Sequence, residues 1–199
     1  DGHAEGDVET LLVPPGQLRA LIVAEADLGE RIVRALILRR VALIEAGAIC
    51  HVPYISTAEA DRFTYRDHAQ VRLVGDIELT QEAAVAKLYD GVPKLWASIH
   101  IAGGFAMAPV SKTTKSDLMK QIEINYVTAF LCCRASVNAM TSTGAGGRIV
   151  NVATRPALEW RAGAGMVAYT ASKAAVAALT VALAEEVVKS GILVNAIAP

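Results

Sequence analysis

The chain has 199 residues, of which 53% are hydrophobic, which is enough for one substantial hydrophobic core. Its formal net charge at pH 7 is −1 and it has no long basic run, so it lacks the electrostatic signature of proteins that bind nucleic acid or anionic membranes. We expect a small, largely uncharged molecule as its ligand.

The apolar stretches also argue against a membrane-spanning protein. The longest apolar stretches, such as 174–184, are far shorter than the roughly 20 residues needed to cross a bilayer. The three cysteines, Cys50, Cys132 and Cys133, have no spacing typical of a metal site or a disulfide framework. Because residues 1–3 do not resemble the start of a secretory signal sequence, we expect none here. These features favour the reducing cytoplasm.

In chain order, residues 1–17 are turn-rich and predict a flexible leader. Short apolar strands then alternate with longer amphipathic helices. Strands are predicted at 18–23, 49–55, 71–74, 95–101, 148–152 and 192–197, and helices at 29–45, 80–89, 116–140 and 168–189. The alternation predicts an α/β fold of the Rossmann type, a doubly wound parallel sheet covered on both faces, in a single domain over residues 18–199.

Tyr169 and Lys173 lie four residues apart at the start of a predicted helix, so their side chains share one face. A phenol by itself is a poor acid–base group near neutral pH, because its unperturbed pKa is about 10. A neighbouring ammonium stabilises the phenolate and makes the phenol a usable proton donor or acceptor. Taken alone, the pair also fits a boundary tyrosine beside a solvated lysine.

The sequence around this pair contains three ordered segments. They are Gly147-Arg-Ile-Val-Asn-Val-Ala-Thr154, Tyr169-Thr-Ala-Ser-Lys173 and Gly191-Ile-Leu-Val-Asn-Ala-Ile-Ala-Pro199. With them the chain resembles the short-chain dehydrogenase/reductase family from about residue 71 to residue 199. The resemblance implies an oxidoreductase that uses NAD or NADP to transfer hydride to a carbonyl or from a secondary alcohol. It also implies that the C-terminal part of the family fold, which recognises the substrate, is lacking here.

Four catalytic residues follow from the resemblance. Tyr169 is the general acid–base, and Lys173 binds the nicotinamide ribose and assists the phenol. Thr154 stands where the family usually has serine, and its hydroxyl can still donate to a substrate oxygen. It precedes Tyr169 by about two residues more than is usual, so we expect the intervening loop to bulge. Asn125 matches a helix asparagine that relays protons to the lysine through water, although a purely structural role also fits a buried amide.

The cofactor side follows the family less closely. Ala102 and Gly103 match the end of the family's Asn-Asn-Ala-Gly motif, whereas His100 and Ile101 replace its asparagines. We interpret His100 as a hydrogen-bonded core histidine rather than a catalytic base. The resemblance also implies that Glu78 accepts a hydrogen bond from the adenine amino group, and plain surface exposure is the alternative.

The first turn departs most from the family, whose pattern there is Thr-Gly-x-x-x-Gly-x-Gly. Of these glycines only Gly29 remains, and with Leu28 and the following helix N-terminus it would hold the pyrophosphate. Glu25 and Asp27 bring negative charge to the same place, so we expect weak dinucleotide binding. A degraded family member that acts as a binding or assembly module is therefore the alternative function.

Three further expectations concern the cofactor and the assembly. The resemblance places Pro199, after the last predicted strand, among the cofactor-binding residues. Segment 53–57 has neither the acidic residue that favours NAD nor the arginine that favours NADP, so the choice stays open. Family members commonly pair the helices that correspond to 116–140 and 168–189, which implies a homodimer or homotetramer.

Overall fold

The structure is a computed structural model that describes residues 47–199. The chain divides into two compact units, one of Asp1–Cys50 with His68–Val71 and the other of His51–Asp67 with Arg72–Pro199. The predicted leader, the first predicted strand and helix, and the site residues Leu28 and Gly29 lie outside the described residues. Every other predicted site residue belongs to the second unit.

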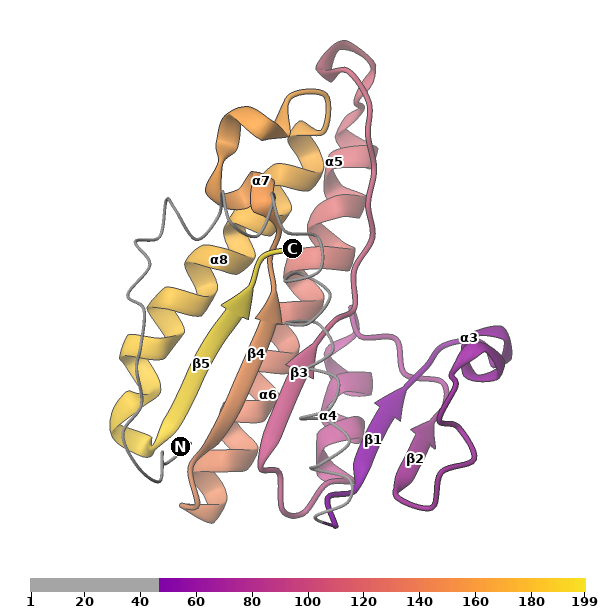
Figure 1. Cartoon of the computed structure of the whole chain (residues 1–199), viewed down its shortest axis with the longest axis vertical. Helices are drawn as coiled ribbons and strands as arrows, with labels where there is room; N and C mark the ends of the chain where they lie inside the picture. The colour runs from indigo at the N-terminus through magenta and orange to yellow at the C-terminus, as the bar shows by residue number, and fades with distance from the viewer. Residues whose placement is uncertain (1–46) are drawn as a thin grey trace, which may run out of the picture. The chain divides into compact units, whose positions relative to one another are not determined.

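The centre of the second unit is a parallel sheet of three strands in the order β3-β4-β5 (Figure 1). The strands are β3 (Ala97–His100), β4 (Gly147–Val152) and β5 (Ile192–Ile197). Ala97 of β3 pairs with Arg148 of β4, and Gly147 of β4 pairs with Ile192 of β5. Because the strands are parallel, their carboxyl ends meet at one edge, which is where parallel sheets bind ligands.

Two long helices, α6 (Thr128–Thr143) and α8 (Val167–Val187), pack against this sheet and against each other (Figure 1). Alternate residues of a strand point to opposite faces of the sheet. In β5, Ile192 and Val194 therefore join the buried core, while Leu193 between them is 44% exposed. The core also contains Cys133 and Met140 of α6, Ile149 of β4 and Val187 of α8.

The remaining elements are shorter. Strands β1 (Cys50–Pro53) and β2 (Val71–Val74) form a two-stranded sheet, and the Tyr54 amide donates to the Val74 carbonyl at their ends. The shorter helices are α3 (Thr57–Arg62), α4 (Glu82–Asp90), α5 (Lys115–Gln121) and α7 (Arg155–Leu158), and α4 packs on α6. Three 3₁₀ turns are η1 (Val110–Lys112), η3 (Trp160–Gly163) and η4 (Val188–Ser190). Parallel strands flanked by helices confirm the predicted α/β class of Rossmann type.

The helix predicted over 116–140 is continuous but not uniform. A π-helical segment, η2 (Ile122–Val127), separates α5 from α6 and contains Asn125. The Asn125 side chain bonds to both backbone groups of Gly104, so a tertiary contact accompanies the wider turn. Segments of π-helix inside α-helices frequently mark functional sites.

The loop expected between Thr154 and Tyr169 contains helical turns, because α7 and η3 lie within it. Thr154 forms the extended N-cap of α7, and Pro156 lies in its first turn, where a missing amide hydrogen costs nothing. Arg155 and Glu159 form an ion pair one turn apart. The longer connection to Tyr169 is therefore folded into helical turns.

By length and composition, one helix among the described residues could cross a membrane: Val167–Ser190, which is α8 with η4. In the sequence, Lys173 interrupts the apolar run of this helix. Packed core helices pass the same test, and α8 buries Ser172, Val176 and Thr180 against the rest of the chain. The predicted lack of a membrane partner stays a prediction.

Candidate functional site

The predicted catalytic pair lies at the start of α8, beside the carboxyl end of β4. Tyr169 is in the first turn of α8 and is half-buried. Lys173 is only 5% exposed, and its Nζ donates to the carbonyl oxygen of Val152, the last residue of β4, at 2.7 Å. Burial lowers the pKa of Lys173. The strand therefore fixes the lysine head group at the edge of the sheet.

Asn125 is buried and uses its whole side chain in hydrogen bonds. Its Oδ1 accepts from the Gly104 amide at 3.0 Å, and its Nδ2 donates to the Gly104 carbonyl at 3.0 Å. Nδ2 also lies 3.1 Å from Ser172 Oγ and 3.2 Å from Gln121 Oε1. Asn125 thus clamps the segment after β3 onto α5 and α8. A proton relay from Asn125 to Lys173 stays a prediction.

Gly103 makes possible the close approach of this segment. A Cβ atom at position 103 would collide with Asn125 Oδ1 and lie 3.4 Å from Lys173 Nζ. Ala102 and Gly103 are exposed, so their backbone is accessible next to the lysine. The structure therefore brings together Gly103, Asn125 and Lys173, in a contact that leaves no space for a side chain at position 103.

The segments that carry Thr154 and Pro199, at the ends of β4 and β5, are joined by backbone hydrogen bonds. Thr154 directly follows Ala153, whose amide donates to Ile197 of β5, and the amide of Arg155 donates to the Pro199 carbonyl at 2.9 Å. Thr154 is 7% exposed, and its hydroxyl forms no hydrogen bond within residues 47–199. That hydroxyl is therefore available to a substrate oxygen.

Glu78 lies at the surface, after the buried Ile77. Its Oε1 accepts from the Thr80 amide at 3.1 Å and from the Thr80 hydroxyl at 2.9 Å. Glu78 is thus exposed and hydrogen-bonded to a neighbouring residue, which is compatible with both interpretations. A contact with adenine stays a prediction.

His100 lies in a network that the sequence did not reveal. Its Nδ1 is 2.8 Å from Asn151 Oδ1, and its Nε2 is 2.9 Å from Ser98 Oγ and 3.3 Å from the Tyr89 hydroxyl. Because Asn151 Nδ2 donates to Thr180 Oγ1 at 2.9 Å, Asn151 presents its oxygen to His100, which makes Nδ1 the protonated nitrogen. Burial lowers the pKa of His100 to about 4. It is a neutral, hydrogen-bonded core histidine.

Two further residues lie at this edge, Phe105 and Met107, and no sequence motif marks them. The rings of Phe105 and Tyr169 meet edge to face, with centroids 5.0 Å apart and planes at 81°. Met107 lies near Gly165, and the Ala108 amide donates to the Gly165 carbonyl at 2.9 Å. A hydrophobic run directly after the Ala-Gly motif was their only sequence signal.

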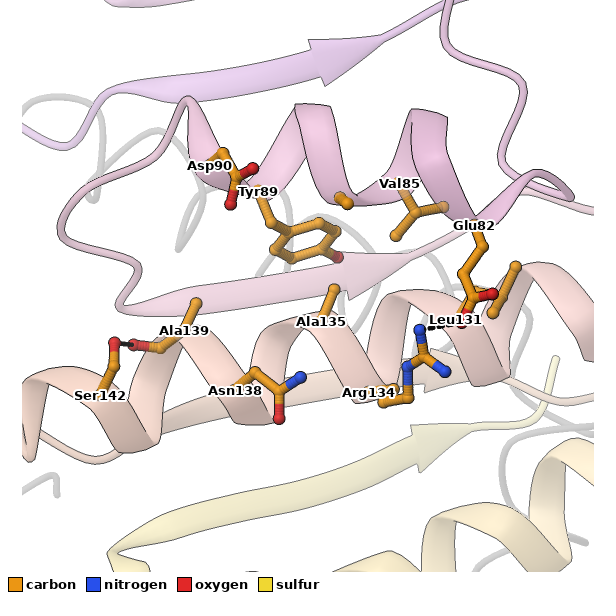
Figure 2. Close-up of a pocket in the computed structure, with 11 residues that line it drawn as sticks. Glu82, Val85, Tyr89, Asp90, Leu131, Arg134, Ala135, Asn138, Ala139 and Ser142 are labelled. Carbon is orange, nitrogen blue, oxygen red and sulfur yellow. Dashed lines mark hydrogen bonds and ion pairs between the residues drawn. The ribbon is translucent and has the colours of Figure 1, made fainter.

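Two pockets lie apart from the predicted site residues. One of about 300 Å³ lies between α4 and α6, as Figure 2 shows, and an ion pair between Arg134 and Glu82 spans one end of it. The other, of about 480 Å³, lies where η3 meets the start of α8 and is lined by Trp160 and Thr170, among others. Neither contains Tyr169 or Lys173.

Comparison with known proteins supports the resemblance. The family model described as short chain dehydrogenase matches residues 42–199. A (2S)-[(R)-hydroxy(phenyl)methyl]succinyl-CoA dehydrogenase subunit BbsD of Thauera aromatica is 33% identical over 144 residues, which are 71% of this chain and 56% of that protein. A sorbitol dehydrogenase of Cereibacter sphaeroides is 30% identical over 145 residues, 71% of this chain and 56% of that protein. The chain thus spans about half the length of these relatives.

Solved structures have the same fold. The crystal structure of sorbitol-6-phosphate 2-dehydrogenase SrlD from Erwinia amylovora superposes with a TM-score of 0.69 at 23% identity, covering 79% of this chain and 64% of that one. The match with the family model covers most of the sequence, including the segments that carry Asn125, Thr154 and Tyr169. This chain belongs to the short chain dehydrogenase family.

Proposed function

We propose that this chain carries the catalytic centre of an NAD- or NADP-dependent oxidoreductase that reduces a carbonyl or oxidises a secondary alcohol. One observation carries the proposal. Buried Lys173 is fixed to the end of β4 one helical turn from Tyr169, with the exposed backbone of Gly103 beside it. In parallel sheets this edge is the usual place for a ligand.

The residues fit a nicotinamide in the part of the site that the structure describes. The backbone of Ala102 and Gly103 is exposed and accessible to a ribose, and the neighbouring Lys173 ammonium can donate to a ribose hydroxyl. A reduced nicotinamide bound there would supply hydride to the substrate carbon. Pro199 and Glu78 are proposed to complete the cofactor site.

The protein's own contribution is the proton. As hydride reaches the carbonyl carbon, the Tyr169 hydroxyl donates its proton to the carbonyl oxygen, and the O–H bond of the new alcohol forms. The Lys173 ammonium stabilises the phenolate left behind until solvent returns a proton, with Asn125 proposed to support that path. The Thr154 hydroxyl donates a hydrogen bond to the same oxygen and orients it. Alcohol oxidation reverses these steps.

The choice between NAD and NADP is left open by the residues after β1. Residues 54–57 contain no acidic side chain and no arginine. Glu59, further along, is engaged in the capping box of α3, where it accepts from the amides of Ile55 and Ser56. Both cofactors therefore remain candidates, and both belong in the binding test.

The names of the two relatives favour this substrate class. One is named a dehydrogenase of a hydroxy(phenyl)methyl compound and the other a dehydrogenase of sorbitol, and both names describe alcohols. We carry over only the shared reaction type, because this chain spans about half of each protein.

One observation favours the alternative, a binding or assembly module. The family match begins at residue 42, beyond the first turn, where Glu25 and Asp27 replace the glycine-rich pattern. Titration of the full chain with NADH and NADPH, followed by nicotinamide fluorescence and thermal unfolding, distinguishes the two functions. Saturable binding raises stability by about 2.7 kcal/mol at 100 times the Kd. Binding and turnover of a carbonyl panel support the oxidoreductase, and a lack of both supports the module.

We also propose a cytoplasmic homodimer or homotetramer without nucleic-acid or membrane partners. Large apolar side chains remain exposed on both long helices, for example Phe130 of α6 at 41% and Val181 of α8 at 67%. Pairing these helices across a two-fold axis would cover them. Cys132 and Cys133, which form no disulfide within residues 47–199, agree with a reducing compartment.

A further inference from the structure

We propose that Phe105 and Met107 form an apolar wall of the substrate site, which selects substrates bearing an aromatic or bulky apolar group beside the reacting carbon over polyhydroxylated ones. The inference rests on the proposed function, because it assigns the substrate class of the same site. It is carried by the contacts of the segment that follows β3.

The first observation is the direct contact between Phe105 and Tyr169. The edge-to-face geometry, with ring centroids 5.0 Å apart, is a favourable arrangement for aromatic pairs. Phe105 is nevertheless 62% exposed, so most of its ring is uncovered. A substrate whose carbonyl oxygen meets the Tyr169 hydroxyl therefore has this apolar ring surface next to its substituent.

The second observation is that the wall is held in place. Asn125 clamps Gly104, directly before Phe105, through both backbone groups. Beyond the phenylalanine, the Ala108 amide donates to the Gly165 carbonyl at 2.9 Å, which joins this segment to the residues that precede α8. Both ends of the segment are thus tied to elements that carry the catalytic residues.

Met107 extends the wall and lies between the hydrogen-bonded residues Gly104 and Ala108. It is 65% exposed, and a Cβ atom at Gly165 would lie 3.5 Å from its Cε. A methionine side chain is flexible and polarisable, so it adapts to apolar groups of different shape. Together, Phe105 and Met107 offer a rigid surface and an adaptable one.

The third observation is the chemical composition of the segment. Residues 101–109 are Ile-Ala-Gly-Gly-Phe-Ala-Met-Ala-Pro, without one hydrogen-bonding or charged side chain. The hydroxyls of Thr154 and Tyr169 are both assigned to the reacting oxygen. Each further substrate hydroxyl covered by this wall would lose water without gaining a partner, which is unfavourable. An apolar substituent would instead gain from burial.

The experiment measures reduction of two ketones by the full chain, with whichever reduced dinucleotide it prefers. One is acetophenone, and the other is dihydroxyacetone. We expect kcat/KM to favour acetophenone by tenfold or more, a ratio of about the size that apolar pocket contacts provide. In Phe105→Ser, kcat/KM for acetophenone should fall about tenfold, while that for dihydroxyacetone changes little. Phe105→Leu should retain most of the preference.

The matched control is Val110→Ser, which removes another exposed apolar side chain, at 71%, from η1 after the same segment. It should leave both kcat/KM values unchanged. Unfolding temperature and dinucleotide affinity of each variant verify that fold and cofactor site are intact. An equal loss for both ketones in Phe105→Ser, or a preference of the unmodified chain for dihydroxyacetone, overturns the wall but leaves the oxidoreductase standing. Failure to turn over any carbonyl overturns the proposed function, and the wall with it.

Discussion

Lys173 donates a hydrogen bond from its Nζ to the carbonyl oxygen of Val152 at 2.7 Å, which joins α8 to the carboxyl end of β4. The lysine is buried, and burial lowers its pKa below the ordinary value of 10.5. The unfolded chain therefore holds this proton more tightly than the folded chain. Between the lowered folded pKa and 10.5, raising the pH removes the proton first from the folded form and adds stability.

The first prediction concerns the effect of Lys173 on the pH dependence of stability. As pH rises from neutrality toward 10.5, the unmodified chain should gain stability relative to Lys173→Met, which has no proton to lose. Urea unfolding at a series of pH values measures the difference. Lys189→Met removes an exposed lysine, and its stability should change with pH as that of the unmodified chain does. A constant difference between the unmodified chain and Lys173→Met over the whole range would show that burial does not perturb Lys173.

The second prediction concerns the proton donor. Tyr169→Phe removes only the hydroxyl, and its edge-to-face contact with Phe105 can persist. We expect kcat/KM to fall by about 10²-fold or more, with the unfolding temperature and dinucleotide affinity nearly unchanged. Steady-state kinetics and a dinucleotide titration measure the two effects. Retention of most of the unmodified rate on an accepted ketone would remove Tyr169 from the catalytic role.

The sequence predicted the strands well where apolar runs end at turn residues. Strands β2 and β5 have the predicted limits, Val71–Val74 and Ile192–Ile197. Local pattern is sufficient there, because each strand is a short, mostly apolar run bounded by turn residues. The spacing of Tyr169 and Lys173 likewise predicted a shared helix, and the structure places both in α8.

Features that depend on tertiary contacts were not predictable in this way. The apolar period runs through Ile122–Val127 without a break, and the π-helical turn there accompanies the contact of Asn125 with Gly104. Helix α7, between Thr154 and Tyr169, was not predicted, although a proline such as Pro156 is permitted in a first helical turn. The contact between Phe105 and Tyr169 joins distant parts of the chain, and no local spacing indicates it.

The third prediction tests the assembly. A carboxylate on the exposed face of α8 would be buried without a partner if the helices pair across a two-fold axis. We therefore expect the unmodified chain to be a dimer or tetramer at micromolar concentration, and Val181→Glu to dissociate it. Val110→Glu, on η1, should leave the assembly intact. Light scattering measures both, and a monomeric unmodified chain would refute the prediction.

The fourth prediction concerns the first turn, which lies outside the described residues. Carboxylates at Glu25 and Asp27 would face a bound diphosphate, and a like-charge contact at 4 Å costs on the order of 4 kcal/mol at an effective dielectric constant of about 20. We expect weak binding of NADH and NADPH that improves when Glu25→Gly and Asp27→Ser are combined. Titration of both proteins decides. Low micromolar or tighter affinity in the unmodified chain, or no gain in the variant, would contradict the electrostatic argument.

The fifth prediction follows from the network around His100. Burial lowers the pKa of His100 from 6.5 to about 4, so the folded chain keeps the ring neutral while the unfolded chain protonates it as the pH falls through 6.5. Stability is therefore lost between pH 6.5 and about pH 4. At about 1.4 kcal/mol per pKa unit, the loss is on the order of 3 kcal/mol. Tyr89 and Cys133, which face the ring, stay neutral in this range because burial raises the pKa of both.

The variant His100→Asn isolates this effect, because an amide can bond to Asn151 but does not titrate. Urea unfolding at neutral pH and near pH 4.5 should show a smaller loss of stability on acidification in the variant than in the unmodified chain. His68→Asn, which removes an exposed histidine, should lose as much as the unmodified chain does. Carboxylates such as Asp117, whose pKa is lowered by hydrogen bonds from Thr114, contribute equally to all three proteins and cancel in the comparison. An equal loss of stability on acidification in His100→Asn and the unmodified chain would mean that folding does not change the pKa of His100.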